Sequence, residues 1–181
     1  MKINGGKYRG KSLFSPQSEA VRPTSDRMRE AVFNILRSRL GFDLSDKVFY
    51  DVFAGSGAMG LEALSQGFGS VYFFDTDTAT LQKNLKLFPN EAARAHVVCG
   101  DILQLRPLDA PADVLFMDAP YNKGLTEKAL LRLGAGAFLR DGALCLVEVE
   151  KNEKCLLPPA FELLDERRYG LAKLIIARFK A

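Results

Sequence analysis

The sequence has one histidine, three cysteines and no apolar stretch long enough to cross a membrane. A reaction that needs a histidine base could use only His96, which lies in an apolar segment, so we interpret His96 as a structural residue. The cysteines are widely spaced and predict neither a disulfide framework nor a zinc site. The N-terminus also lacks the apolar run of a signal peptide. We therefore expect a cytoplasmic protein that uses no metal and has no membrane partner.

Length and composition favour one domain. The chain has 181 residues, of which 48% are hydrophobic and 26% are charged, so it can bury one core and has no compositional sign of disorder. It contains no internal repeat and no low-complexity linker. We expect a monomer with a single domain over residues 1–181, made of a basic hairpin or arm (1–20), a helix (21–41) and an α/β core (46–181).

The net charge of +3 is unevenly distributed. Residues 1–40 hold nine lysines and arginines against three acids, a balance of +6, so the rest of the chain sums to −3. A basic segment joined to a mildly acidic body is typical of a polyanion-binding arm, because neutralising phosphates supplies most sequence-independent affinity for nucleic acid. The alternative is ordinary solvated charge on a hairpin and a helix.

Short apolar runs alternate with helical patterns from residue 48 onward. Strands are expected at 48–53, 70–74, 95–99, 113–117 and 143–149, and one or two more, possible antiparallel ones, in the tail around 168–177. Helices are expected near 58–66, 78–88 and 125–133, after an earlier helix that opens at Pro23-Thr24-Ser25 and stops at Gly41. This order predicts an α/β fold with a doubly wound, Rossmann-like, mostly parallel seven-stranded sheet covered by helices on both faces.

A glycine-rich turn follows the first strand, which ends at Asp51-Val52-Phe53 and continues into Ala54-Gly55-Ser56-Gly57. Glycines allow a tight turn and let a ligand lie against the backbone at the carboxyl edge of the sheet. The spacing also matches GxGxxG, which nicotinamide and flavin enzymes use. Asp51 favours another ligand, because its carboxylate would repel a pyrophosphate but attract the ammonium and sulfonium groups of S-adenosylmethionine.

Two further acids follow the second and third strands. Asp75 lies twenty residues beyond Gly55, where a carboxylate can accept hydrogen bonds from both ribose hydroxyls. Both classes of cofactor use such an acid, so Asp75 supports the crevice without identifying its ligand. Asp101 could contact an adenine amino group, although an acid after a strand is more often a helix cap or a solvated turn.

The fourth strand leads into Asp118-Ala119-Pro120-Tyr121 at the same edge of the sheet. The amino group of a base is a poor nucleophile, because its lone pair is delocalised into the ring. A carboxylate and a backbone carbonyl that accept its N–H bonds would direct the lone pair toward a methyl donor. A neighbouring aromatic ring can stack on an extruded base. The alternative is a plain turn that ends a strand.

Three segments resemble one known family over nearly the whole chain: Gly5-Gly6-Lys7-Tyr8-Arg9-Gly10, Arg22-Pro23-Thr24-Ser25-Asp26-Arg27-Met28-Arg29-Glu30 and Asp51-Val52-Phe53-Ala54-Gly55-Ser56-Gly57-Ala58-Met59-Gly60-Leu61-Glu62-Ala63-Leu64. They resemble the RsmD-type small-subunit rRNA guanine-N2 methyltransferases. The resemblance implies a class I S-adenosylmethionine-dependent methyltransferase fold. It also implies transfer of a methyl group to the N2 amine of a guanine in 16S rRNA, free or in the assembling small ribosomal subunit, with S-adenosylhomocysteine as product.

The resemblance also implies residue roles. Asp51, Gly55 and Gly57 would border the methionine part of the cofactor, Asp75 the ribose and Asp101 the adenine. The residues expected to contact the cofactor are Asp51, Phe53, Ala54, Gly55, Ser56, Gly57, Asp75, Thr76, Asp101, Ile102 and Asp118. The catalytic turn is Asp118, Ala119, Pro120 and Tyr121, in which Asp118 and Tyr121 hold the base. The residues expected to contact nucleic acid are Lys7, Arg9, Lys11, Arg22, Thr24, Arg27 and Arg29. For Arg22, Arg27 and Arg29, salt bridges to the catalytic turn are an alternative role.

Ala119 departs from the family pattern, which usually reads Asp-Pro-Pro-Tyr or Asp-Pro-Pro-Phe. The carbonyl at 119 is kept, but the fixed torsion of proline is lost and an N–H is added, so we expect a slower or looser site. Three alternatives stay open. The chain could be an adenine-N6 methyltransferase of DNA or RNA, although Asp rather than Asn at 118 leans against it. It could be a catalytically weak RNA-binding paralogue or assembly factor, or a nicotinamide oxidoreductase.

Overall fold

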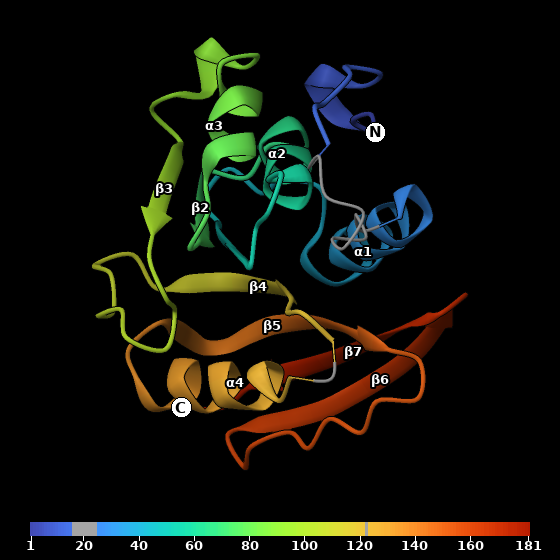
Figure 1. The fold of residues 1–181 in the computed structure, drawn as a ribbon, viewed down its shortest axis with the longest axis vertical. Helices are drawn as coiled ribbons and strands as arrows, with labels where there is room; N and C mark the ends of the chain where they lie inside the picture. Colours follow the sequence, from blue (N-terminus) through green and yellow to red (C-terminus); the bar gives the residue numbers. More distant parts are fainter. Residues whose placement is uncertain (16–24, 122) are drawn as a thin grey trace.

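The structure is a computed structural model that describes residues 1–15, 25–121 and 123–181 (Figure 1). These residues form a seven-stranded sheet in the order β3-β2-β1-β4-β5-β7-β6. The strands are β1 (Val48–Val52), β2 (Ser70–Asp75), β3 (Ala95–Cys99), β4 (Ala112–Asp118), β5 (Leu139–Glu150), β6 (Phe161–Tyr169) and β7 (Ala172–Phe179). The helices are α1 (Asp26–Leu40), α2 (Ala58–Ser65), α3 (Ala79–Leu85) and α4 (Leu125–Ala135), with short 3₁₀ turns η1 (Gly6–Tyr8) and η2 (Pro89–Glu91).

Strand directions confirm the predicted mostly parallel sheet. Strands β1 to β5 pair in parallel, whereas β7 runs antiparallel to both β5 and β6. The tail therefore provides two strands, both longer than the apolar pattern indicated. Most residues of β6 are exposed, because β6 lies at the edge of the sheet. An edge strand with charged side chains gives no continuous apolar run to detect.

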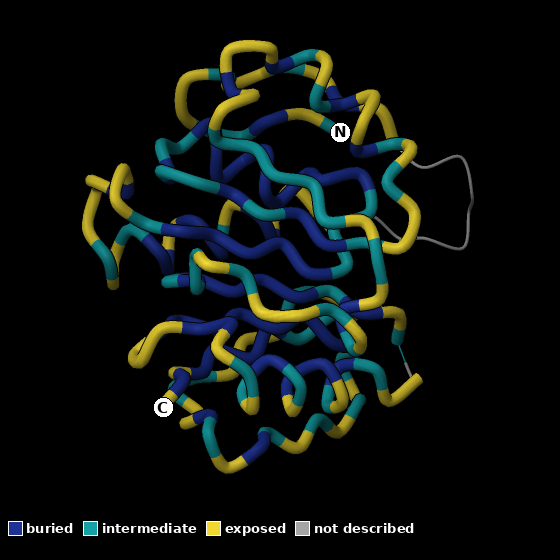
Figure 2. The backbone as a smooth tube through the Cα atoms, turned by 90° about the vertical axis from the view of Figure 1, so that its left-hand side faces the viewer, coloured by how far each residue is buried: buried dark blue, intermediate teal, exposed yellow. Residues whose placement is uncertain are grey.

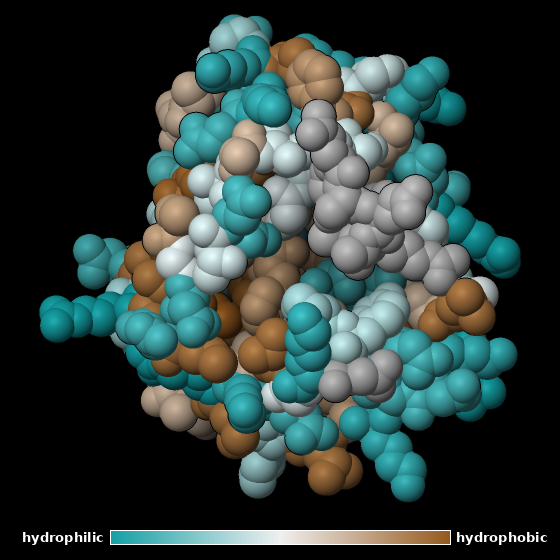
Figure 3. Space-filling model, viewed as in Figure 1, coloured by the Kyte–Doolittle hydropathy of each residue, from teal (hydrophilic) through white to brown (hydrophobic). Residues whose placement is uncertain are grey.

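Alternate strand residues point to opposite faces of the sheet. Phe49 and Phe116 belong to a buried cluster with α1, α2 and α3, and Tyr50 and Leu115 belong to a second cluster with α4. Figure 1 shows α1, α2 and α3 on one side of the sheet and α4 on the other, and in Figure 2 the strands between them are largely buried. The predicted helices on both faces are thus present. On the face seen in Figure 3, hydrophilic side chains surround a central hollow with hydrophobic residues on its floor.

Helix α1 begins and ends where its sequence dictates. The Ser25 hydroxyl accepts a hydrogen bond from the amide of Met28 at 3.1 Å, as an N-cap does. Gly41 ends the helix with φ +84°, a conformation that glycine adopts without strain. The buried face includes Val32, Phe33 and Leu36. The predicted helix began at 21, but residues 21–24 lie outside the described ranges.

The N-terminal residues form a small hairpin that packs on α2. Lys2 and Ser12 form an antiparallel bridge, and the amide of Ile3 donates to the carbonyl of Lys11 at 3.0 Å. The side chain of Ile3 is buried in the same cluster as α2, so this hairpin is joined to the main core. Residues 16–20 of the predicted arm are outside the part that the structure describes.

A buried glutamate on α2 holds this hairpin. The carboxylate of Glu62 is 0% exposed and accepts the backbone amides of Asn4 and Gly5, each at 2.7 Å. The amide of Tyr8 donates to the Ser65 hydroxyl at 2.9 Å, and that hydroxyl donates to the carbonyl of Gly5 at 2.6 Å. The Gly5-Gly6 pair in the sequence therefore serves a close approach of the hairpin to α2.

Candidate active site at the carboxyl edge of the sheet

The turn after β1 has three residues in the left-handed region, namely Phe53 (φ 63°), Gly55 (φ 55°) and Gly57 (φ 77°). A Cβ on Gly57 would lie 2.3 Å from Cδ1 of Leu81 in α3, so this glycine allows tight packing. At Gly55 no described atom lies within 4 Å of the Cβ position. The two glycines thus have different roles, because Gly57 faces the core and Gly55 faces open space in which a ligand could lie.

Asp51 is a buried acid beside this turn. It is 2% exposed, and its Oδ2 accepts the amide of Gly60 at the start of α2 at 2.8 Å. Burial raises the pKa of Asp51 to about 7, against the lowering effect of the Gly60 hydrogen bond, and the charge of Asp75 adds to the rise. A nearby cation would favour the charged form of this carboxyl group.

Asp75 ties the end of β2 to the glycine-rich turn. Its Oδ2 accepts the amide of Gly55 at 2.7 Å and its Oδ1 accepts the amide of Asp77 at 3.0 Å. Ala54 and β2 are joined as well, since the amide of Ala54 donates to the carbonyl of Phe74 at 3.0 Å. The carboxylate of Asp75 therefore lies where the turn and the ends of the strands meet.

Asp101 and Ile102 follow β3 at the same edge. The amide of Gly100 donates to the carbonyl of Asp75 at 2.9 Å, which brings the two strand ends together. Asp101 is exposed and its Oδ1 accepts the amide of Leu103 at 2.9 Å, as a turn-capping acid does. Ile102 is buried in the cluster on the α4 face. The carbonyl oxygen of Thr76 accepts a hydrogen bond from the Cys99 thiol, with 3.7 Å between oxygen and sulfur.

The turn after β4 is the predicted catalytic turn. Asp118 is the last residue of β4 and is half-buried, Ala119 is 2% exposed, and Pro120 is exposed. The Tyr121 hydroxyl donates to Oε1 of Glu148 on β5 at 3.0 Å. Because β1 and β4 are neighbours in the sheet, this turn and the glycine-rich turn leave the same edge side by side.

Glu148 is a site residue that the sequence analysis did not identify. It is buried, and it faces Asp118 in the register of β4 and β5. A sign of it was present in the sequence, since Glu148 interrupts the apolar run of its strand. A buried acid within an apolar strand has a specific partner more often than not.

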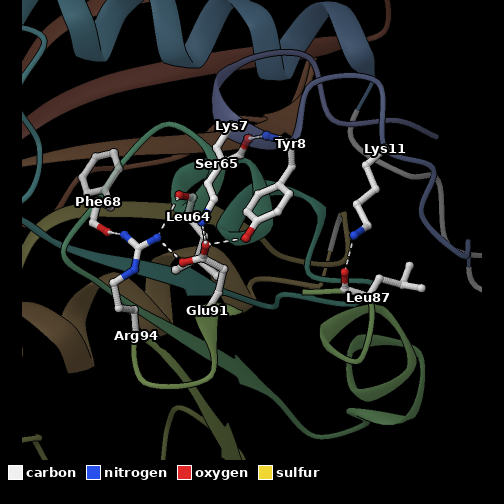
Figure 4. A network of polar contacts seen from close by, with 9 residues as sticks. All are labelled: Lys7, Tyr8, Lys11, Leu64, Ser65, Phe68, Leu87, Glu91 and Arg94. Carbon is white, nitrogen blue, oxygen red and sulfur yellow. Dashed lines mark hydrogen bonds and ion pairs between the residues drawn. The ribbon is translucent and has the colours of Figure 1, made fainter. Parts of the chain in front are cut away.

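The exposed basic residues near the N-terminus include Lys7, Arg9 and Arg27. Lys7 donates to Glu91 at 3.2 Å, and Lys11 donates to the carbonyl of Leu87 (Figure 4). These two lysines therefore hold the hairpin against the body of the protein. The predicted contacts of Arg22 and Thr24 lie outside the described residues.

Glu91 is the centre of the network in Figure 4. It accepts the Tyr8 hydroxyl at 2.6 Å and pairs with Lys7 and Arg94. Burial opposes its ionisation, but the hydrogen bonds from Tyr8, Arg94 and Lys7 lower the pKa of Glu91. The carboxylate is thus a stable anchor for the hairpin.

The structure corrects the nucleic-acid role predicted for Arg29. Arg29 is 0% exposed, donates to the carbonyl of Lys2 at 2.6 Å and pairs with Asp26. A guanidinium that is completely buried cannot contact a phosphate from solvent, so Arg29 joins α1 to the hairpin instead. The helical spacing placed Arg29 beside exposed residues, whereas the folded chain buries it and brings it to the carbonyl of Lys2 in the hairpin.

A polar hollow of about 460 Å³ lies between the hairpin, α1 and the end of α2. It is lined by Asn4, Gly5, Gly6, Arg9, Glu30, Arg37 and Gln66. Arg37 donates to Gln66 at 3.0 Å and to Asn34 at 2.9 Å, and both of these acceptors are neutral. The charged side chains that line this hollow are therefore two arginines and one acid, Glu30.

No helix in ranges 1–15, 25–121 and 123–181 is long and apolar enough to cross a membrane. In the same part of the chain, no three His, Cys, Asp or Glu side chains are grouped so that they could hold a metal ion.

The strand order, the antiparallel β7 between β5 and β6, and the glycine-rich turn after β1 define the class I methyltransferase fold. The solved structure of the Escherichia coli protein yhhF has a TM-score of 0.83 at 33% identity, covering 100% of this chain and 98% of that chain. The fold is shared by a Burkholderia thailandensis 1,6-didemethyltoxoflavin-N1-methyltransferase solved with S-adenosylhomocysteine, with a TM-score of 0.64 at 18% identity, covering 84% of this chain and 78% of that chain.

The family follows from sequence comparison. The family model described as "Conserved hypothetical protein 95" matches residues 1–178. The chain is 38% identical over 173 residues to the Escherichia coli K12 protein named ribosomal RNA small subunit methyltransferase D, covering 94% of this chain and 85% of that protein. Identity to the Haemophilus influenzae protein of the same name is 34% over 177 residues, covering 94% and 90%. The chain belongs to this family of RsmD-type methyltransferases, and the predicted resemblance is confirmed.

Proposed function

We propose that this protein transfers a methyl group from S-adenosylmethionine to the N2 amine of a guanine in the 16S rRNA of the small ribosomal subunit. The observation that carries the proposal is the arrangement at the carboxyl edge of the sheet. There the buried Asp51 lies on β1 and the open position at Gly55 lies in the turn after it, while the neighbouring strand β4 ends at Asp118 and is followed by the turn that holds Tyr121. A cation-attracting crevice beside a turn suited to an amino group is what such a transfer needs.

The residues of the first crevice fit S-adenosylmethionine. This cofactor supplies an activated methyl group and brings two positive charges and no phosphate. The carboxyl group of Asp51 is buried and protonates easily, and a cation beside it would restore its charge. Gly55 leaves room for a ligand against the backbone, and Asp75 holds the turn while facing the same edge. Asp101 would then border the adenine.

The turn after β4 would bind the target base. A carboxylate oxygen of Asp118 and the carbonyl of Ala119 can each accept an N–H of the amine, which orients its lone pair toward the first crevice. The ring of Tyr121 is held by its hydroxyl on Glu148 and can stack on the base. Ala119 is buried, so surrounding atoms restrict the turn in part where proline would do so covalently.

Two further observations support rRNA as the substrate. The relatives at 38% and 34% identity are named ribosomal RNA small subunit methyltransferase D and match almost the whole chain. Exposed Arg9 and Arg27 can contact phosphates, and Arg9 also lines the polar hollow beside α1 together with Arg37.

The test uses labelled S-adenosylmethionine with small ribosomal subunits, and separately with protein-free small-subunit rRNA, from cells that lack this gene. We expect label in rRNA, and mass spectrometry of the nucleosides should identify N2-methylguanosine. The Asp118→Ala variant should bind the cofactor but transfer no methyl group. N6-methyladenosine as the product would favour the adenine alternative. RNA binding without label in any substrate would favour a non-catalytic assembly factor.

A further inference from the structure

Glu148 lies beside the strand end that leads into the proposed base-binding turn. It lies on β5, is 5% exposed, and faces Asp118 on the neighbouring strand β4. Neighbouring strands are about 4.8 Å apart, so the two carboxyl groups start from adjacent points of the same edge. Asp118 is the last residue of β4, before the proposed base-binding turn, and Glu148 lies beside it near the end of β5.

The two side chains also point to the same face of the sheet. Phe116 and Leu146 are partners in the register of β4 and β5, and both pack in the cluster with α1, α2 and α3. Side chains two residues apart on a strand share a face. Asp118 and Glu148 are two residues further along and are partners in turn, so both are directed to the α1 side of the sheet.

A carboxylate at this place can accept more hydrogen bonds than the one from the Tyr121 hydroxyl. Oε1 of Glu148 accepts the Tyr121 hydroxyl at 3.0 Å, and an ionised carboxylate offers about four acceptor sites. Burying a carboxyl group costs free energy unless hydrogen bonds compensate it. An ionised carboxylate at this place can accept a donor of the substrate while it holds the tyrosine.

The Watson–Crick edge of guanine presents such a donor. Its N1–H lies beside the N2 amino group, so the edge offers two neighbouring donor groups to two neighbouring acceptors. In adenine N1 has no hydrogen and is itself an acceptor, which a carboxylate would repel. We propose that Glu148 is a specificity-determining residue that accepts the N1–H of the target guanine while Asp118 accepts its N2–H. The inference rests on the proposed function and extends it to the choice of base.

The test compares guanine with 2-aminopurine, a base that keeps the 2-amino group but has an acceptor at N1. Both are placed at the methylated position of a synthetic fragment of the small-subunit rRNA. We expect the wild-type protein to favour guanine by about 10- to 100-fold in kcat/KM, which is the discrimination one good base contact gives. In Glu148→Gln this ratio should fall about 10-fold or more, because the amide can donate to N1 of 2-aminopurine.

Tyr121→Phe is the matched control, since it removes the hydroxyl and leaves Glu148 in place. It should slow transfer to both bases and leave their ratio as in the wild type. A thermal melt of each variant with and without S-adenosylmethionine checks folding and cofactor binding. An unchanged ratio in Glu148→Gln would overturn the inference, as would an equal fall of the ratio in Tyr121→Phe, which would place the effect in the tyrosine.

The wild-type protein alone gives an independent answer if Glu148→Gln does not fold. Equal kcat/KM for guanine and 2-aminopurine in the wild type refutes the selection by Glu148 and leaves the proposed function intact. Absence of methyl transfer to the guanine substrate refutes the proposed function and the inference together.

Discussion

Replacing Gly6 by alanine tests whether the N-terminal hairpin depends on its close approach to α2. At Gly6 φ is +75° and a Cβ would lie 1.9 Å from the carbonyl oxygen of Ser65, a backbone atom that cannot rotate away. At Gly10 φ is +84°, but no described atom lies within 4 Å of the Cβ position. Gly6→Ala and Gly10→Ala therefore share the cost of a left-handed alanine, about 1 kcal/mol, and differ in the clash.

The structure gives the size of the difference. Real Cβ contacts are not shorter than 3.0 Å, so the hairpin must move away from Ser65. That movement stretches the bonds from the amides of Asn4 and Gly5 to Glu62, each 2.7 Å long. Hydrogen bonds to a charged group contribute about 1.5–3 kcal/mol each, so Gly6→Ala should cost about 3–6 kcal/mol more than Gly10→Ala.

The assay is urea unfolding of both variants and the wild type, followed by circular dichroism. In a thermal melt of the same proteins the melting temperature of Gly6→Ala should fall about 6–24 °C below that of Gly10→Ala, at about 2–4 °C for each kcal/mol in a chain of this size. If the two variants unfold within about 1 kcal/mol of each other, the hairpin does not depend on this approach and the reasoning is wrong.

Three further predictions concern the site and the basic surface. Burial raises the pKa of Asp51 to about 7 from 3.8, so the unfolding free energy of the ligand-free protein should fall as pH rises from about 4 to about 7. Urea unfolding at a series of pH values measures this fall, and Asp51→Asn should lack the part of it that Asp51 causes. Ala119→Pro should preserve or raise turnover in the methyl-transfer assay, and a sharp loss would show that the turn after β4 is wrongly placed. Arg27→Ala should weaken RNA binding and reduce the slope of log K against log salt by about 1. Arg29→Ala should instead lower the unfolding free energy, because Arg29 is buried. Weaker RNA binding by Arg29→Ala at unchanged stability would contradict this buried role.

Much of the sheet could be predicted because its first four strands are short apolar runs, of which the central β1 and β4 are buried on both faces. The runs at 48–53, 70–74, 95–99 and 113–117 are nearly continuous and correspond to β1 to β4 with shifts of one residue or none at each end. The early part of β5 was missed, since residues 140–142 are exposed and polar. Helix α3 was predicted near 78–88 but ends at Leu85, because Pro89 follows in a 3₁₀ turn.

The site residues also divide into those that the sequence could predict and one that it could not. Asp51, Asp75 and Asp118 lie at or next to the last residues of their strands, and Gly55 lies in the turn after β1. Parallel strands bring their carboxyl ends to a common edge, so the proximity of these residues could be argued from the order of elements. Glu148 could not be identified from the order of elements, because it lies within its strand and its partner Tyr121 is 27 residues away in the chain.

The amino-acid sequence by itself determined the kind of sheet, the edge where ligands meet the strands and the family, because hydrophobic periodicity and glycine spacing are local properties of the chain. The tertiary structure alone decided which charges are available. Arg29 and Glu62 are completely buried in the folded chain, where each contacts the hairpin, and Glu148 acquires Asp118 as its neighbour when β5 pairs with β4. Burial and partnership arise from segments that are distant in the chain, and no local pattern records them.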